Sequence, residues 1–265
     1  MSGARRSSSP ASASELEAYR YPGYYEIAFA SRDCGREVAF FETAIAKFSG
    51  AAVRRVFELG CGTAPYLEEW HQRGYRFCGL DLSPAMLESA RAKARRRGID
   101  AEFVEGDMRD LDPALGPFDL AYVLLGSLYL RSNREFLDHL DRMAGLLAPG
   151  ALYLLDSFVW FRIFHDYRRS WVRRRAGITV RTRYRAAVTD PIAQTYDECL
   201  TFAVDDRGRD LIVAGRVPTK VFFPQEFLCL VELSRRFEFI GWYSDFGWTA
   251  PLRPEGRHIV VLRKR

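Results

Sequence analysis

The chain has 265 residues, 48% of them hydrophobic and 28% charged, and its net charge at pH 7 is +5. These values are typical of a globular protein with one sizeable core, and they exclude a disordered or fibrous chain. No apolar run approaches the length of a membrane span, and the N-terminus has no hydrophobic signal core. The five cysteines include no C-x-x-C pair, so we expect no zinc site and no disulfide framework, but a reducing, cytoplasmic compartment.

The N-terminal part divides into a tail, an arm and a helix. Residues 1–14 are rich in Ser, Ala and Gly, which predicts a disordered tail. Residues 15–50 begin with an arm that carries four tyrosines. A helix is then predicted from about residue 34 to residue 49, because apolar residues recur at helical spacing: Val38, Phe41, Ile45 and Phe48.

The segment from Val56 to Pro65 predicts a buried strand, a glycine turn and the start of a helix. Gly60 and Gly62 lack a Cβ, so a ligand can lie against bare backbone there. A dinucleotide site needs Gly or Ala at the sixth position of the loop, where this chain has Pro65. Glu58 would repel a pyrophosphate but suits a ligand that bears an ammonium and a sulfonium. The loop by itself leaves a dinucleotide site and an S-adenosylmethionine site open.

The run from Glu58 to Thr63, Glu-Leu-Gly-Cys-Gly-Thr, resembles the first motif of class I S-adenosylmethionine-dependent methyltransferases. The resemblance implies a Rossmann-like fold and S-adenosylmethionine as the cofactor. Small-molecule members of the glycine and amino-sugar N-methyltransferase type have a similar N-terminal arm, which implies that residues 15–50 form a lid over the cofactor. It also implies a set of contacts to the cofactor from the arm and the loop: Tyr25, Arg32, Glu58, Gly60, Cys61 and Gly62.

A second predicted strand ends at Asp81, about 20 residues past the glycine loop. A ribose-binding carboxylate belongs at this point of a βαβ nucleoside site. Ser83 and Pro84 then suit the N-cap and first position of a helix. The pattern Asp-x-Ser-Pro-x-Met is again similar to the family pattern, so Asp81, Leu82 and Met86 are expected at the cofactor.

Two further strands are predicted over residues 101–105 and 118–125. After the first, the resemblance implies that Asp107 accepts the adenine amino group and that Met108 contacts the ring. After the second, it implies that the backbone of Leu124, Leu125 and Ser127 faces the amino-acid end of the cofactor. The sequence does not place Asn-Pro-Pro-Tyr here, the signature of enzymes that methylate nucleobase amines and glutamine amides, which argues against nucleic-acid and protein acceptors.

Strands and helices alternate up to residue 156, which predicts a parallel sheet with helices on both faces and ligands at the carboxyl ends of its strands. A helix over residues 224–237 and a closing hairpin complete seven strands, as in the family. The inward face of that helix is predicted to carry Phe227, Leu228, Val231 and Leu233. The expected core therefore comprises residues 51–156 and 224–265.

Residues 157–223 change the pattern: aromatic side chains alternate with arginines, and three segments of alternating polarity follow. This predicts a small antiparallel sheet inserted into the Rossmann-like core. Similar insertions cover the acceptor site in small-molecule methyltransferases, and a dimer contact is the alternative. Aromatics beside arginines also suggest RNA stacking, but most such arginines are solvated.

The sequence thus predicts a methyltransferase that transfers a methyl group from S-adenosylmethionine to an N or O atom of a small molecule. A catalytically inactive cofactor-binding regulatory protein, an RNA methyltransferase and a nicotinamide oxidoreductase are the alternatives. We expect no metal, nucleic-acid or membrane partner, and a homo-oligomer stays open. If a general base is used, it should lie in the insertion: His165 is the candidate, with Glu198, Tyr196, Asp166 and Tyr184 as its rivals.

Overall fold

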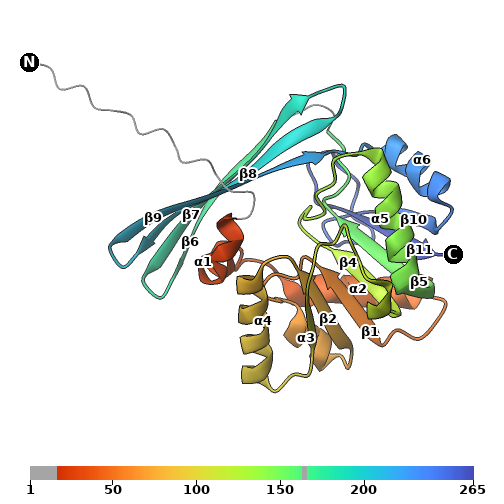
Figure 1. Ribbon diagram of the computed structural model, residues 1–265, viewed down its shortest axis with the longest axis horizontal. Coiled ribbons are helices and arrows are strands. Elements are labelled where there is room, and N and C mark those ends of the chain that lie inside the picture. The colour runs from red at the N-terminus through yellow and green to blue at the C-terminus, as the bar shows by residue number, and fades with distance from the viewer. Residues whose placement is uncertain (1–16, 163–165) are drawn as a thin grey trace, which may run out of the picture.

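The computed structural model describes residues 17–162 and 166–265. Figure 1 shows a central sheet flanked by helices, and a second sheet of long strands that extends away from it. The tail expected at residues 1–14 lies outside the described residues. No helix in the described part of the chain is both long enough and apolar enough to cross a membrane.

Helices and strands alternate through the first half of the core, as the sequence predicts. The elements from the arm to the fourth strand are η1 (Glu17–Arg20), α1 (Pro22–Ala28), α2 (Cys34–Phe48), β1 (Arg55–Leu59), α3 (Leu67–Gln72), β2 (Arg76–Asp81), α4 (Pro84–Arg97), β3 (Glu102–Glu105), η2 (Pro113–Leu115) and β4 (Phe118–Val123). The remaining elements are α5 (Asn133–Leu146), β5 (Leu147–Asp156), β6 (Tyr167–Arg175), β7 (Ile178–Asp190), β8 (Thr195–Asp206), β9 (Arg209–Lys220), α6 (Pro224–Ser234), β10 (Phe237–Ser244) and β11 (His258–Lys264).

The central sheet has seven strands in the order β10-β11-β5-β4-β1-β2-β3. Strands β1 to β5 pair in parallel, whereas β11 runs antiparallel to both of its neighbours. The order reverses between β1 and β4, which is the switch point where open α/β sheets bind ligands at the carboxyl ends of their strands. The predicted Rossmann-like class and the seven strands are confirmed.

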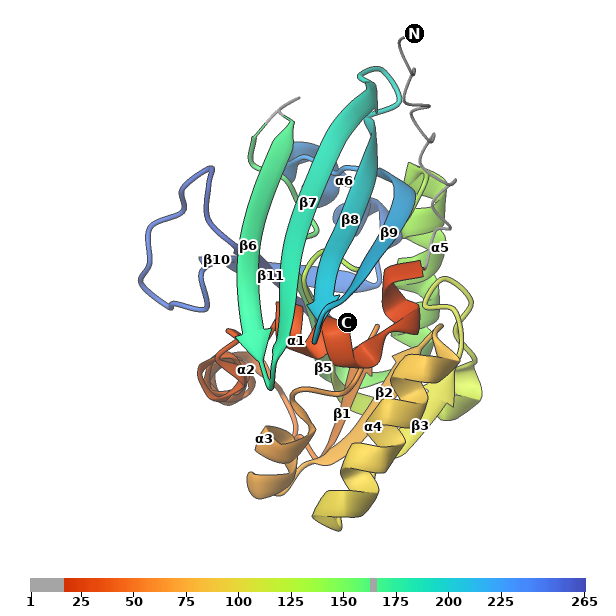
Figure 2. The ribbon, with the colours of Figure 1, turned by 90° about the vertical axis from the view of Figure 1, so that its left-hand side faces the viewer.

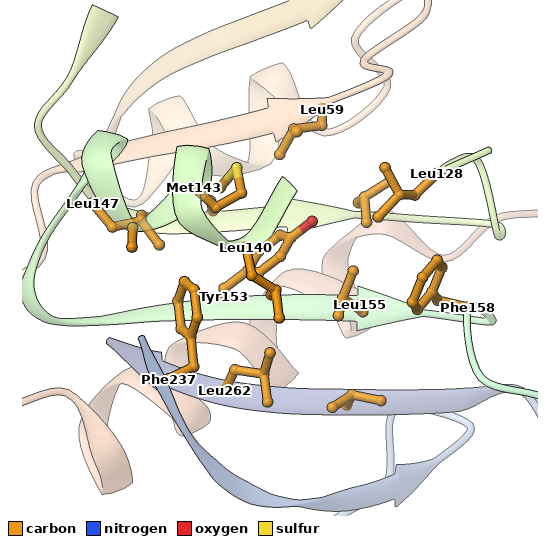
Figure 3. Packing of buried hydrophobic residues seen from close by; sticks show 14 of the residues in the cluster. Leu59, Leu128, Leu140, Met143, Leu147, Tyr153, Leu155, Phe158, Phe237 and Leu262 are labelled. Carbon is orange, nitrogen blue, oxygen red and sulfur yellow. The ribbon is translucent and has the colours of Figure 1, made fainter. Parts of the chain in front are cut away.

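Two apolar clusters hold the helices to the two faces of this sheet. Helices α2, α3 and α4 pack on one face, and helices α5 and α6 pack on the other. Figure 3 shows the cluster between the sheet and helices α5 and α6, in which Leu140 and Met143 of α5 lie over Tyr153 and Leu155 of β5. All four side chains are fully buried, so this face forms the dry core that supports the strand ends.

The helix ends follow the predicted caps. The Ser83 and Ser132 hydroxyls accept the backbone N–H groups of Met86 and Glu135, which begins α4 at the predicted residue and α5 at Asn133. One prediction was wrong in detail: α3 begins at Leu67 rather than three residues earlier, because the chain is still turning there.

Helix α6 corrects a second prediction. Leu233 was predicted to face inward, but it is 65% exposed, and Leu230 is buried in its place. The reason is helical geometry, because a step of 3.6 residues per turn groups Leu230 with Phe227 and Val231 and turns Leu233 away. The helix is also shorter than predicted and ends at Ser234.

The inserted segment forms a separate four-stranded antiparallel sheet in the order β6-β7-β8-β9, here named the second sheet. It lies between β5 and β10 in the chain, as predicted, but its first strand, β6, was not predicted as a strand. β6 is an edge strand with seven of its nine residues exposed, so it lacks the alternation that marks a half-buried strand.

The second sheet has two chemically different faces. Its inner face packs on the arm through a cluster that includes Ile27, Val180 and Phe202, and Figure 2 shows α1 at the foot of the sheet. Its outer face carries exposed arginines of β7 that alternate with buried residues: Arg181, Arg183 and Arg185. The inner face therefore looks toward the carboxyl ends of the central strands.

Candidate cofactor and acceptor site

The glycine loop after β1 is a tight turn with little side-chain bulk. Gly60 and Gly62 have φ values of +65° and +54°, which L side chains rarely adopt. A Cβ on Gly60 would lie 3.1 Å from the Met108 Cε atom. The Gly62 N–H donates to Asp81 Oδ2 at 2.7 Å, so the loop is fixed against the end of β2.

A cavity of about 130 Å³ lies beside this loop, at the carboxyl ends of β1 and β2. We name it the small cavity. Nine of the residues that the sequence predicted at the cofactor line it: Tyr25, Gly60, Gly62, Asp81, Leu82, Met86, Asp107, Met108 and Ser127. Residues up to about 100 positions apart in the chain therefore meet at one edge of the sheet.

Asp81 is the last residue of β2, and it lines the small cavity. Its Oδ1 accepts the Ser83 N–H at 2.8 Å, while its Oδ2 accepts the Gly62 N–H. Burial raises the pKa of the Asp81 carboxyl, and backbone N–H donors oppose that shift. Each oxygen can still accept one more hydrogen bond, so the carboxylate is oriented and able to receive a ligand hydroxyl.

Asp107 lies at the other side of the small cavity and is already paired. Both of its oxygens accept from the Arg109 guanidinium, at 2.6 to 3.0 Å, and this pairing lowers the pKa of the Asp107 carboxyl. The neighbouring Met108 carbonyl lies 3.0 Å from the His139 Nδ1 atom, which orients that peptide.

Glu58 is buried behind the loop rather than in the cavity wall. It is 3% exposed, and its Oε2 accepts the Tyr122 hydroxyl at 3.1 Å. The Tyr122 oxygen in turn accepts from Trp70 Nε1 at 2.8 Å. Burial raises the pKa of the Glu58 carboxyl to about 8, and the Arg32 guanidinium opposes that shift. Glu58 has no salt bridge within the described residues, so its charged form would gain from a ligand ammonium.

Arg32 lies close to Glu58 but is held by aromatic rings. Its guanidinium is 5.9 Å from the Tyr25 ring centroid, 5.6 Å from that of Phe29 and 6.0 Å from that of Tyr66. Its buried Nε atom has no hydrogen-bond partner within the described part of the chain. An uncompensated N–H donor of this kind is costly, which marks a place for an anionic ligand group.

Three other predicted residues lie away from the small cavity. Cys61 packs against β2, where a Cβ on Gly79 would come within 2.6 Å of its Sγ atom. Leu124 is 5% exposed and belongs to the core, and Leu125 lines a second, larger cavity.

The larger cavity has a volume of about 680 Å³ and lies between the central strand ends, the arm and the second sheet. We name it the large cavity. Its walls are rich in aromatic side chains, including Phe29, Trp160, Phe161 and Trp171. The two cavities share five wall residues: Tyr19, Tyr25, Ser127, Tyr129 and Val217. A ligand in one would therefore adjoin a ligand in the other.

The arm forms part of this shared wall and is fastened to the core. The Ser83 hydroxyl donates to the Tyr19 carbonyl at 2.9 Å, and the hydroxyls of Tyr19 and Tyr129 are 3.4 Å apart. Lys93 of α4 pairs with Glu26 of α1 at 3.1 Å. Apolar contacts of Ala18 and Ile27 with the second sheet add to these polar contacts.

The candidates for a general base are separated by the fold. His165 lies outside the described residues. Asp166 is outside the cavity wall and lies 3.8 and 4.0 Å from the guanidinium groups of Arg168 and Arg185. Tyr196 is fully buried against Trp160. Two of the five, Tyr184 and Glu198, line the large cavity.

His258 also lines the large cavity, although sequence reasoning did not single it out. Its ring stacks on Phe161 with 4.0 Å between centroids, and its Nε2 donates to the Arg253 carbonyl at 2.6 Å. Burial lowers the pKa of the imidazole, so Nδ1 is an acceptor at neutral pH. The sequence contained a signal for this position. His258 is the first residue of β11, and because β11 runs antiparallel to β5, it lies beside the carboxyl end of β5.

A buried ionic network supports the end of β4. Asp156 is fully buried and accepts both the Leu125 N–H and the Arg257 guanidinium. Arg257 Nη1 also donates to Glu37 of α2 at 2.6 Å, and Glu37 accepts the Tyr66 hydroxyl. The network joins the loop after β4, the loop before β11 and the N-terminal helix.

Residues 56–150 match the family model described as "Methyltransferase domain". This segment is similar to that family of domains. The match covers β1 to the first part of β5, including the glycine loop, Asp81 and Asp107, so this segment supplies much of the small-cavity wall.

Curated proteins are similar to part of the chain. The chain is 33% identical over 108 residues to a dTDP-4-amino-2,3,4,6-tetradeoxy-D-glucose N,N-dimethyltransferase of Saccharopolyspora spinosa, covering 40% of this chain and 41% of that relative. The chain spans about half or less of the length of the curated relatives it matches. The likeness is therefore to a part of those proteins.

Solved structures are similar over nearly the whole chain. An S-adenosylmethionine-dependent methyltransferase from Clostridium acetobutylicum ATCC 824 has a TM-score of 0.75 at 14% identity, with 91% of this chain and 96% of that chain covered. CalS10, an amino pentose methyltransferase from Micromonospora echinaspora solved with S-adenosylmethionine bound, has a TM-score of 0.69 at 22% identity, with the same coverage. At these identities the likeness establishes the fold alone.

Proposed function

We propose that this chain is an S-adenosylmethionine-dependent methyltransferase that methylates an N or O atom of a small molecule. The observation that carries the proposal is the pair of adjoining cavities at the carboxyl ends of the central strands. The small cavity suits a nucleoside, and the large cavity suits an organic acceptor. Their shared wall would let one ligand present a reactive group to the other.

The residues around the small cavity fit this cofactor. Asp81 is oriented to accept the ribose hydroxyls, and the bare backbone at Gly60 admits close approach of a ligand. Burial disfavours the charge of Glu58, and the buried Arg32 Nε has no hydrogen-bond partner within the described residues, so the pair suits the ammonium and carboxylate of an amino acid. When bound, S-adenosylmethionine supplies an electrophilic methyl group on a sulfonium.

The chain itself would then bind, orient and exclude water. We assign the arm, residues 15–50, as a lid, because Tyr19 and Tyr25 lie in the wall of both cavities. We assign residues 157–223 as the cover of the acceptor, because the inner face of the second sheet lines the large cavity. Asp107 and Met108 would contact the adenine, although Asp107 must then share its oxygens with Arg109.

A small acceptor is favoured by enclosure. The large cavity is walled by the arm and the second sheet, and its lining is rich in aromatic side chains. The exposed arginines of β7 lie on the outer face, away from this cavity, so they do not argue for RNA as the methylated molecule. The names of the similar proteins, an amino pentose methyltransferase among them, support a small acceptor in the same way.

Calorimetry with the full chain tests the cofactor assignment. We expect S-adenosylhomocysteine to bind with one equivalent per chain and NADH not to bind. NADH binding without S-adenosylhomocysteine binding would contradict the proposal. Transfer of a labelled methyl group to any small amine, phenol or sugar would distinguish an enzyme from an inactive cofactor-binding protein.

A further inference from the structure

Glu198 lies in the middle of β8, on the inner face of the second sheet. Its side chain is 9% exposed and lines the large cavity. Its neighbour across the ladder in β9 is Val217, which belongs to the wall shared by the two cavities. Glu198 therefore stands beside the junction at which a methyl donor and an acceptor would meet.

The charge of Glu198 has no counter-ion in the described part of the chain. Its carboxyl is hydrogen-bonded to the Tyr184 hydroxyl, and burial raises its pKa to about 7. The next acid along β8, Asp197, shows the contrast, since it lies on the outer face in an ion pair with Arg216. A buried carboxyl with a single neutral partner costs stability, so a stabilising role does not explain it.

The surroundings of Glu198 are those of a cation site. Tyr184 of β7, Tyr19 of η1 and Tyr129 after β4 lie close to its carboxyl. Arg169 of β6 and His258 of β11 line the same cavity. Arg169 lies 5.7 Å from the Trp171 ring centroid. Aromatic faces around one carboxylate attract an ammonium group through both charge and cation–π contact.

We propose that Glu198 binds the ammonium group of an amine acceptor and accepts one of its protons before methylation. This inference rests on the proposed function and narrows its acceptor to an amine. The proton passes from nitrogen to a carboxylate oxygen, and the lone pair left on nitrogen forms the new C–N bond. The methyl–sulfur bond breaks, and its electron pair stays on sulfur. Glu198 later releases its proton to water.

The chemistry favours an amine over a hydroxyl. An alkyl ammonium has a pKa of about 10, as lysine has, which is only a few units above the pKa of about 7 of Glu198. A sugar hydroxyl is a far weaker acid, and a carboxylate would deprotonate it poorly. An alcohol also brings no charge to offset that of the ionised Glu198.

A thermal-shift experiment on the full chain with saturating S-adenosylhomocysteine tests this inference. The probes are cyclohexylammonium, benzylammonium and glucosaminium, each beside its hydroxyl analogue, at about pH 8. We expect at least one ammonium probe to raise Tm by several degrees and its hydroxyl analogue to leave Tm unchanged. Glu198→Gln should abolish the shift, and Asp197→Asn, the matched acid on the outer face, should retain it.

Other outcomes overturn the inference. These are no shift with any ammonium probe, an equal shift with the alcohols, or a shift that survives in Glu198→Gln. If that variant does not fold, Glu198→Asp replaces it, and the expected result is at least a tenfold loss of ammonium affinity. S-adenosylhomocysteine calorimetry on the same samples separates the two proposals, because its failure would contradict the cofactor and its success would leave Glu198 as the point tested.

Discussion

The fully buried Asp156 carboxylate accepts the backbone N–H of Leu125, with 2.8 Å between the two atoms. Leu125 has a φ of +58°, and the following Gly126 has a φ of +68°. A side-chain acceptor from β5 thus holds the loop after β4 in a conformation that L residues seldom adopt. The same carboxylate binds Arg257, so the loop that carries Ser127 depends on this ion pair.

Asp156→Asn should therefore destabilise the fold strongly. The substitution leaves the partly buried Arg257 with Glu37 as its remaining counter-ion, and breaking a buried ion pair costs about 3–5 kcal/mol. Urea denaturation followed by circular dichroism measures the change. Asp138→Asn, which removes an exposed ion pair with Arg134, is the control and should cost less than about 0.5 kcal/mol. Equal effects of the two substitutions would contradict the role given to Asp156.

Asp81→Ala should weaken cofactor binding. The variant loses charge-assisted hydrogen bonds to the ligand, each worth about 1.5–3 kcal/mol, so affinity for S-adenosylhomocysteine should fall by at least about 1 kcal/mol. Calorimetry measures the change, with Asp100→Ala, an exposed acid after α4, as the control. If the two variants bind equally well, the ribose assignment of Asp81 is incorrect.

Gly79→Ala should destabilise the centre of the sheet. The new Cβ would lie 2.6 Å from the Cys61 Sγ atom and 3.0 Å from a ring carbon of Phe77, so β1 and β2 must shift, at a cost of about 1–3 kcal/mol. Gly23→Ala is the matched control. Gly23 lies in α1 with no atom within 4 Å of a new Cβ, and alanine is the better helix former there. A neutral Gly79 substitution would show that the loop after β1 is looser than described.

The corrected face of α6 can be tested with a pair of leucines. Leu230→Ala should cost about 2–5 kcal/mol because the side chain is 8% exposed and packs in the core. Leu233→Ala should cost less than about 0.5 kcal/mol because Leu233 is 65% exposed. Denaturant midpoints measure both, and a larger effect at Leu233 would restore the original prediction.

The stability of the ligand-free protein should fall as pH rises toward 7. Burial raises the pKa of Glu198 to about 7 in the folded chain, whereas an unfolded glutamate has a pKa of about 4.3. The folded state therefore holds the proton more tightly, and this contribution is complete below about pH 4 and lost by about pH 7. Glu198→Gln removes this pH dependence. Relative to the difference between the two proteins at pH 4, the free energy of unfolding of the variant at pH 8 should exceed that of the wild type by up to about 3 kcal/mol.

Unfolding midpoints of the two proteins from about pH 4 to pH 8 measure this difference. Other groups titrate equally in both proteins, Glu58 among them, so the comparison isolates Glu198. Parallel pH curves would mean that Glu198 is ionised in the folded state at low pH and has a partner.

Local patterns predicted most of the central sheet. Ser83 and Pro84 mark the start of α4, and the glycines after β1 mark its turn, because caps and tight turns depend on a few adjacent residues. The sequence also predicted Asp81 and Asp107 at one edge of the sheet, because each follows or ends a predicted parallel strand. Strand β6 was missed because most of its side chains are exposed, so its sequence lacks an alternating pattern. The buried face of α6 was predicted wrongly because Leu230 and Leu233 are both apolar, and only one of them faces the core.

The sequence by itself determined the order of elements, the Rossmann-like class and the residues at the strand ends, since these follow from periodicity and spacing along the chain. Only the tertiary structure decided that Glu198, rather than Asp166 or Tyr196, faces the large cavity, and that His258 and Arg257 stand near it. Burial, ion pairing and the joining of two cavities depend on segments up to about 240 residues apart, such as the arm at Tyr19 and the strand at His258. A pattern among neighbouring residues does not predict contacts between segments so far apart in the chain.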